Sequence, residues 1–113
     1  MPLRKEAIMD REILQLIESA KADYARFSGN PERIAKFAEG FLIKKGRKYI
    51  KICHNGAAWA FIVNTHKDEI FAKGDILKPA CWASPIRNRQ RGNVYHGDSV
   101  NWTGPAYISH RGA

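Results

Sequence analysis

Apolar residues in the first third of the chain recur with the period of a helix. Between Glu12 and Phe27 they fall at offsets of 3, 4, 7, 11 and 14 from Ile13, so they form one stripe. This pattern predicts an amphipathic helix over residues 12–27. A shorter helical piece is expected before it, around Ala7–Met9.

A break at residues 28–31 ends this helix and begins another. Asn30 is a favoured N-cap residue, and Pro31 suits the first helical position because its missing N–H would be unpaired there in any case. Apolar residues with helical spacing follow. The pattern therefore predicts a second helix from Pro31 to about Lys45, with Gly46 as its C-terminal cap.

From Arg47 onward the apolar period changes to two, which is typical of strands. Residues 48–53 and 58–63 each have the pattern of a strand, and the Asn55-Gly56 pair between them favours a type I′ hairpin turn. Both faces of the second run are apolar. This indicates a central strand that is covered on both sides.

Shorter strands are expected at residues 70–72 and 76–78, where Pro79 ends the pattern. Two helices packed on three to four antiparallel strands predict an α+β fold. Beyond residue 80 the regular signals fade. One further strand is expected around Val94-Tyr95, and the aromatic segment 102–108 is expected to fold back on the body.

The 113 residues suit one domain with a helical part (1–45), an antiparallel sheet (46–79) and a basic, aromatic, mostly irregular tail (80–113). No run of 18 apolar residues predicts a membrane span. The two cysteines, Cys53 and Cys81, are too few for a disulfide framework and are expected to be buried thiols. These features favour a cytoplasmic protein without membrane contact.

The charge of the chain is unevenly distributed. Residues 1–40 hold seven Lys/Arg and seven Asp/Glu, whereas residues 41–113 hold twelve Lys/Arg and four Asp/Glu. The net charge of +8 therefore belongs to the sheet and the tail. Such asymmetry favours a surface that faces a polyanion beside a neutral packing element, although a surplus of charge for solubility explains it as well.

Two basic runs are candidates for phosphate contact. In the first, an extended segment would place three arginines on one face about 6.7 Å apart, and two amides that can read base edges on the other; its residues are Arg87, Asn88, Arg89, Gln90 and Arg91. In the second, five cations occur without an acid between Phe41 and His54: Lys44, Lys45, Arg47, Lys48 and Lys51. A solvated loop and an edge strand protected by lysines are the respective alternatives.

The aromatic and metal-binding residues give weaker signals. Trp59 lies in the predicted central strand and is expected in the core, whereas Trp82 and Trp102 lie in irregular segments and are candidates for stacking on bases. The histidines and cysteines lack the spacing of a zinc site, so no metal or cofactor is expected. His96 and Asp98 are close in sequence, but a polar turn explains them more simply than a catalytic site.

Two short segments, GDILKPACWASP at residues 74–85 and RGNV at residues 91–94, resemble a group of small tailed-bacteriophage proteins. Residues 48–52 and 59–62 are also similar to the hairpin of that group, so the resemblance covers roughly residues 47–95. Cys81 stands where the group usually has Ser, and Ser84 where it usually has Ala. The resemblance implies a phage origin, in the host cytoplasm or the virion, and it carries over no catalytic residue.

Three functions are compatible with these patterns. The leading hypothesis is a nucleic-acid-binding protein without catalysis, whose basic runs contact phosphates. The second is a phage protein-binding module that inhibits a host factor or belongs to the virion. The third is a small hydrolase or nucleotide binder around His96 and Asp98. The sequence leaves open DNA against RNA, single against double strand, and the oligomeric state.

Overall fold

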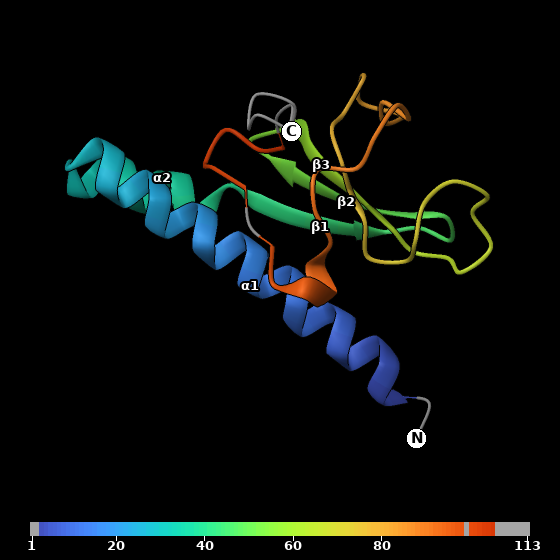
Figure 1. Ribbon diagram of the computed structural model, residues 1–113. Helices are drawn as coiled ribbons and strands as arrows, with labels where there is room; N and C mark the ends of the chain where they lie inside the picture. Colours follow the sequence, from blue (N-terminus) through green and yellow to red (C-terminus); the bar gives the residue numbers. More distant parts are fainter. Residues whose placement is uncertain (1–2, 99, 106–113) are drawn as a thin grey trace, which may run out of the picture.

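The computed structural model describes residues 3–98 and 100–105, with the backbone alone described for residues 3–9. Two helices precede a four-stranded antiparallel sheet of order β1-β2-β3-β4, which confirms the α+β class (Figure 1). The elements are α1 (Leu3–Ser28), α2 (Pro31–Glu39), β1 (Phe41–Lys45), β2 (Tyr49–His54), β3 (Ala57–Val63), β4 (Ile76–Leu77) and a 3₁₀ helix η1 (Val94–His96).

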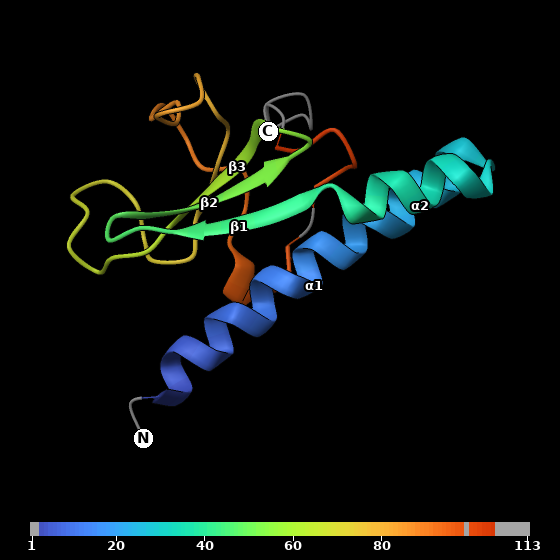
Figure 2. The same ribbon diagram turned by 180° about the vertical axis from the view of Figure 1, so that it is seen from behind.

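Helix α1 crosses one face of the sheet, here called the inner face (Figure 2). Its predicted apolar stripe packs there against the sheet: Ile13, Leu16, Ile17 and Ala20 are all buried. The earlier piece at Ala7–Met9 is continuous with this helix. Both helical predictions for residues 7–27 are therefore confirmed.

The second helix ends at Glu39, so the prediction that it reaches Lys45 is wrong. Gly40 follows it, and the Gly40 N–H donates to the Phe37 carbonyl. The next five residues form β1, in which Ile43 lies opposite Ile52 of β2. Pairing with β2 outweighs helical spacing here, because it puts Phe41 and Ile43 against the core while the alternate residues face away.

The hairpin between β2 and β3 is confirmed. Asn55 and Gly56 have φ values of 50° and 83°, as a type I′ turn requires at both central residues. Residues 59–63 of β3 are all buried, which confirms a central strand covered on both sides, with Trp59 in the core.

Two of the shorter predicted strands are replaced by other structure. Residues 70–72 lie in the loop between β3 and β4, where Phe71 packs on the face of the sheet opposite α1, here called the outer face. Residues 94–96 form η1, because Asn93 caps its start and Gly97 ends it at a φ of 76°. The strand at 76–77 is confirmed.

Other predictions for the tail and the thiols have mixed outcomes. Trp102 folds back on the helices, with its ring centroid 5.0 Å from those of Tyr24 and Phe27; the rest of the predicted aromatic segment, from residue 106 on, lies outside the described residues. Both cysteines are free, but only Cys53 is buried, and the prediction of a buried thiol is wrong for Cys81. In the described part of the chain, no helix is both long enough and apolar enough to cross a membrane.

Candidate nucleic-acid interface

The outer face of the sheet is covered on one half and open on the other. Over β3 and β4, a small core forms from Phe61, Val63, Phe71 and Leu77. Over β1 and β2, alternate residues point away from α1: Leu42 and Lys44 of β1 are exposed, Lys51 of β2 is half-buried, and Cys53 opposite Leu42 is buried. This open half carries the candidate site.

Two lysines lie directly opposite each other on the open half. Lys44 of β1 and Lys51 of β2 are partners in the antiparallel register, so their side chains leave the same face as neighbours. Like charges in this arrangement destabilise a sheet by up to about 1 kcal/mol. β1 is an edge strand, where lysines also protect against edge-to-edge pairing, and both lysines have the Trp82 ring as a partner.

The ring of Trp82 lies over these two lysines. The ring centroid is 3.7 Å from the Lys51 ammonium nitrogen and 5.4 Å from that of Lys44, which are cation–π distances. The residue is still 46% exposed. Both lysines rise from the sheet toward the ring, and about half of the residue remains open to solvent. The site therefore combines a stacking surface with two adjacent positive charges.

The loop that carries Trp82 is fixed at both ends beside β4. The Ile86 N–H donates to the Lys78 carbonyl at 2.7 Å, and the Arg91 N–H donates to the Ile76 carbonyl at 2.7 Å. At the tip, the Ala80 N–H donates to the Ser84 carbonyl at 2.9 Å. The tryptophan is thus held by a short hydrogen-bonded turn.

The three arginines of the predicted extended run do not share an accessible face, which corrects that expectation. Arg87 donates twice to the Asp68 carboxylate, each time at 3.0 Å, and once to the Tyr49 hydroxyl at 2.6 Å. Arg91 is 5% exposed and donates to the Asn88 side chain and the Arg89 carbonyl. Arg87 is half-buried, and Arg89 is the most exposed of the three.

Asp68 explains why Arg87 is held in place. Its carboxylate accepts hydrogen bonds from Arg87 and from the backbone N–H groups of Phe71 and Ile70, and these bonds hold the pKa of Asp68 far below its usual value. The same pair raises the pKa of Arg87. Both shifts favour the charged forms of the two partners.

The two amides of this run serve the loop itself. Asn88 accepts from the Arg89 N–H at 2.7 Å and from Arg91 at 3.0 Å, and Gln90 accepts from the Gly92 N–H at 2.7 Å. Both residues are exposed, but these bonds engage their oxygens within the loop. The expected free row of amides for reading bases is not formed.

The second basic run divides between the two faces of the sheet. Lys45 points to the inner side and pairs with Asp10 of α1 at 2.7 Å, so an N-terminal carboxylate neutralises it. Arg47 and Lys48 are exposed in the turn between β1 and β2.

Trp102 is not part of this surface. It packs against the two helices, and its carbonyl accepts a hydrogen bond from the Trp59 indole N–H at 3.1 Å. Its own N–H donates to Asp23 of α1 at 3.0 Å. The expectation that it offers a second stacking surface is replaced by a structural role.

His96 and Asp98 are not brought together. The Asp98 carboxylate accepts from the Asn93 N–H at 2.9 Å, and no hydrogen bond joins the two side chains within the described residues. The same residues contain no group of three or more His, Cys, Asp or Glu that could hold a metal ion. His96 and Asp98 therefore belong to a polar turn around η1.

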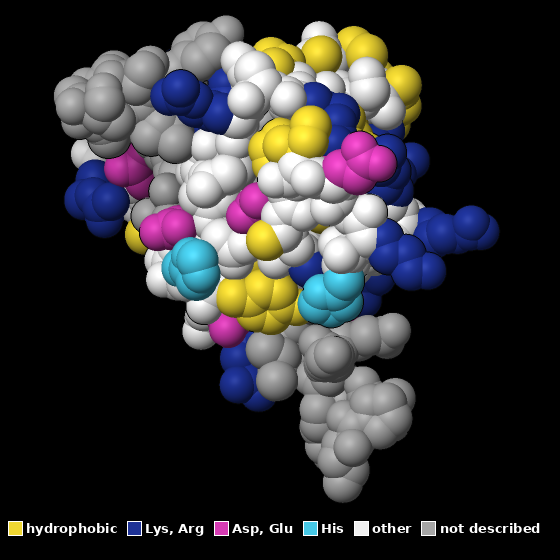
Figure 3. Space-filling model, turned by 45° about the vertical axis from the view of Figure 1, so that its right-hand side comes forward, with side chains coloured by type: hydrophobic (Ala, Val, Ile, Leu, Met, Phe, Trp, Pro, Cys, Tyr) yellow, Lys and Arg dark blue, Asp and Glu magenta, His cyan; other side chains and the backbone are white. Residues whose placement is uncertain are grey.

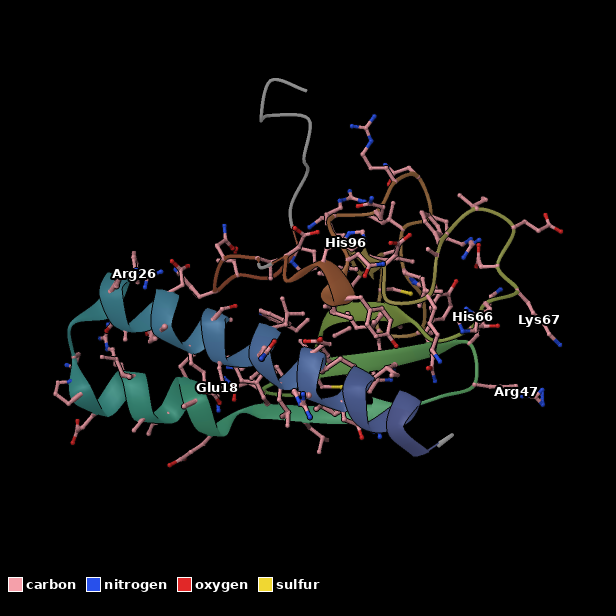
Figure 4. All side chains as sticks on the ribbon, turned by 60° about the horizontal axis from the view of Figure 1, so that its bottom comes forward. Glu18, Arg26, Arg47, His66, Lys67 and His96 are labelled. Atoms are coloured by element: carbon pink, nitrogen blue, oxygen red, sulfur yellow. The ribbon has the colours of Figure 1, made fainter. Side chains whose placement is uncertain are left out.

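Sequence reasoning missed Lys67, Leu42 and the contact between Tyr49 and Arg87. Lys67 lies in the loop after β3 and approaches the β1–β2 turn, as Figure 4 shows for the labelled Lys67 and Arg47. Tyr49 orients Arg87 through its hydroxyl. The alternating pattern of residues 41–45 could have indicated the position of Leu42, because a strand at these residues puts Leu42 and Lys44 on the same face.

The residues that carry the resemblance to phage proteins meet in the fold. The Asn93 amide donates to the buried Asp75 carboxylate at 2.8 Å, and the Val94 N–H donates to the Gly74 carbonyl at 2.9 Å. Gly74 is needed here because its φ is 94° and an added Cβ would lie 2.6 Å from the Tyr95 ring. These motif residues join the tail to β4.

No protein-family model, no curated protein and no solved structure matches this chain. The function therefore has to be inferred from the geometry of the surface itself.

Proposed function

We propose that this protein binds single-stranded nucleic acid through the open half of the outer face. Lys44 and Lys51 contact backbone phosphates, and an unpaired base stacks on the exposed side of Trp82. The observation that carries the proposal is the half-exposed Trp82 ring over two directly opposed lysines. Aromatic platforms beside positive charge are the usual means of holding a single strand.

Two further exposed cations, Arg47 and Lys48, precede β2 in the turn between β1 and β2. Lys51 and Lys48 are three residues apart, which corresponds to about 10 Å along the chain at about 3.3 Å per residue. A strand stacked at Trp82 can therefore continue over Lys51 toward the turn that holds Arg47 and Lys48.

The arrangement favours a single strand over a duplex. In a duplex the flat face of each base is covered by its neighbours, and a protein reaches only the base edges in the grooves. Trp82 offers a ring face at the tip of a loop, which needs an unstacked base. Asn88 and Gln90, the side chains expected to read edges, are engaged within their own loop.

Fluorescence anisotropy with labelled oligothymidylate tests this proposal. Trp82→Ala is expected to weaken binding about five- to a hundredfold, since stacking on an aromatic ring contributes about 1–3 kcal/mol per base. Trp82→Phe keeps a ring and is expected to retain most of the affinity. Unchanged affinity in Trp82→Ala would remove the basis of the proposal.

The lysines are tested by the salt dependence of the same binding. The double variant Lys44→Gln/Lys51→Gln is expected to reduce the slope of log affinity against log salt by about 1.4, at about 0.7 for each phosphate contact on a single strand. The matched control is Arg33→Gln/Lys36→Gln, two exposed cations of α2. An equal effect in the control, or tighter binding of a duplex of the same length, contradicts the assignment.

A further inference from the structure

A second basic feature lies where the β1–β2 turn meets the loop after β3. A cavity of about 440 Å³ opens there, lined by four cations and two carboxylates: Arg47, Lys48, Lys67, Arg87, Asp68 and Glu69. Figure 3 looks toward this end of the molecule and shows Lys and Arg side chains gathered along one side of it. In Figure 4 the labelled Arg47 and Lys67 lie at the same end, far from Arg26.

The walls of the cavity are fixed by hydrogen bonds rather than by loose side chains. The Asn64 N–H donates to the Lys48 carbonyl at 2.8 Å, and its side-chain amide donates to the Gly46 carbonyl at 2.9 Å, so the loop and the turn are tied together. Asp68 then closes the loop on itself through the N–H groups of Ile70 and Phe71. Arg47, Lys48 and Lys67 are thus carried on a defined frame.

The charges of this frame leave a positive excess. The formal net charge of the six ionised lining residues is +2. Asp68 is fully engaged by Arg87, with 1% of its side chain exposed, so its negative charge is cancelled within the wall. Glu69 alone opposes Arg47, Lys48 and Lys67 among the lining residues, and no ion pair involving these four side chains occurs within the described residues.

The size and charge select a class of ligand. Sites for small molecules occupy about 300–1,000 Å³, so this cavity has room for one small anion with an attached organic group. A phosphomonoester carries about −1.5 to −2 at neutral pH and offers three acceptor oxygens to cationic donors. A phosphodiester inside a strand carries a single negative charge, so it balances the net charge of +2 on the lining residues less completely than a phosphomonoester does.

We infer that this cavity binds a phosphomonoester group, held between Arg47, Lys48 and Lys67. The group belongs either to a free nucleotide or to the terminal phosphate of a strand whose bases lie toward Trp82. This site goes beyond the proposed function, and a free nucleotide can occupy it whether or not a strand binds the sheet.

Isothermal titration calorimetry at low ionic strength with AMP, inorganic phosphate and adenosine tests the inference. AMP and phosphate are expected to bind, and adenosine is not. Arg47→Gln and Lys67→Gln are each expected to weaken AMP about tenfold, because each removes a charge-assisted hydrogen bond. The control Lys36→Gln removes an exposed cation from α2, at the other end of the molecule from this cavity, and is expected to change nothing (Figure 1).

The results separate the inference from its rivals. Equal binding of AMP and adenosine, no binding of AMP or phosphate, or an equal effect of Lys36→Gln overturns it. Thermal melting of each variant confirms that the exposed substitutions leave the fold intact.

A pair of oligothymidylates, one with a 5′-phosphate and one with a 5′-hydroxyl, identifies the source of the group. A preference for the phosphorylated strand that disappears in Lys67→Gln supports a strand end, whereas equal affinities together with AMP binding support a free nucleotide. Trp82→Ala is expected to keep AMP binding. If the oligonucleotides fail to bind and AMP binds, the proposed function fails and this inference stands.

Discussion

Replacing Asp68 with asparagine measures the contribution of the Arg87–Asp68 pair to stability. The side chain of Asp68 is 1% exposed and accepts two hydrogen bonds from Arg87 and two from backbone N–H groups. Asparagine keeps one oxygen for the backbone but offers no negative charge to the arginine. The guanidinium then loses its bidentate partner while it remains packed over the Phe71 ring, 5.0 Å from the centroid.

The size of the loss follows from the exposure of the two partners. Breaking a fully buried ion pair costs about 3–5 kcal/mol. Arg87 is 34% exposed, so water offsets part of its lost partner, and the lower end of that range applies. We expect Asp68→Asn to lower the free energy of unfolding by about 3 kcal/mol, or the melting temperature by roughly 12 °C for a domain of this size.

The pH dependence gives this prediction its sharpest test. The folded pKa of Asp68 is lowered, so its contribution to stability is complete above the unfolded value of about 3.9 and is lost as the pH falls below it. Urea unfolding of both proteins between about pH 7 and about pH 3 should therefore show a difference that is constant at first and shrinks at the acidic end.

The matched control is Glu69→Gln, which makes the same change of charge one residue away, at an exposed side chain. It is expected to cost less than about 0.5 kcal/mol. If Asp68→Asn is as stable as the control, or if its deficit is the same at about pH 7 and about pH 3, the pair does not stabilise the fold in the way described.

Two further predictions concern a thiol and a turn. Hydrogen bonding to the Ser84 hydroxyl and to backbone N–H groups, with the charge of Lys51, lowers the pKa of Cys81. Iodoacetamide is therefore expected to label Cys81 at neutral pH faster than an ordinary thiol and to leave the buried Cys53 unmodified. Peptide mass mapping measures both modifications. Labelling of Cys53 before Cys81 would contradict this prediction. Gly56→Ala is expected to destabilise the protein by about 1 kcal/mol, because the φ of Gly56 is 83°. No atom lies within 4 Å of the added Cβ, so only backbone strain contributes. An unchanged midpoint of urea unfolding would contradict this prediction.

Local signals predicted those parts of the fold that depend on local chemistry. The helical spacing from Ile13 to Phe27 and the Asn55-Gly56 turn each act within a few residues, and the helix and the turn are confirmed, although Phe27 at the end of the stripe is exposed. The spacing of apolar residues at positions 41–45 suits a helix as well as a strand, so it cannot exclude the helix that the preceding residues predict. These residues form a strand because they pair with β2, and the spacing of apolar residues does not show the turn that lies between the two strands.

The candidate site was predicted in part. The sequence indicated Trp82, Lys44 and Lys51 as separate candidates, but only the register of β1 and β2 brings the lysines opposite each other beneath the ring. The prediction for Arg87 failed because its partner, Asp68, is 19 residues away, and no local pattern reports such a contact. Alternation along a segment predicts a shared face only where the segment is a strand.

The turn that holds Trp82 is closed at its base by a bridge between Pro79 and Pro85. Its five intervening residues contribute nothing to either hydrophobic core. A loop built in this way can change its length or its residues at little cost to the rest of the molecule. Under the proposed function, exchange of this tip alone would therefore alter which ligand binds, while the scaffold beneath it stays the same.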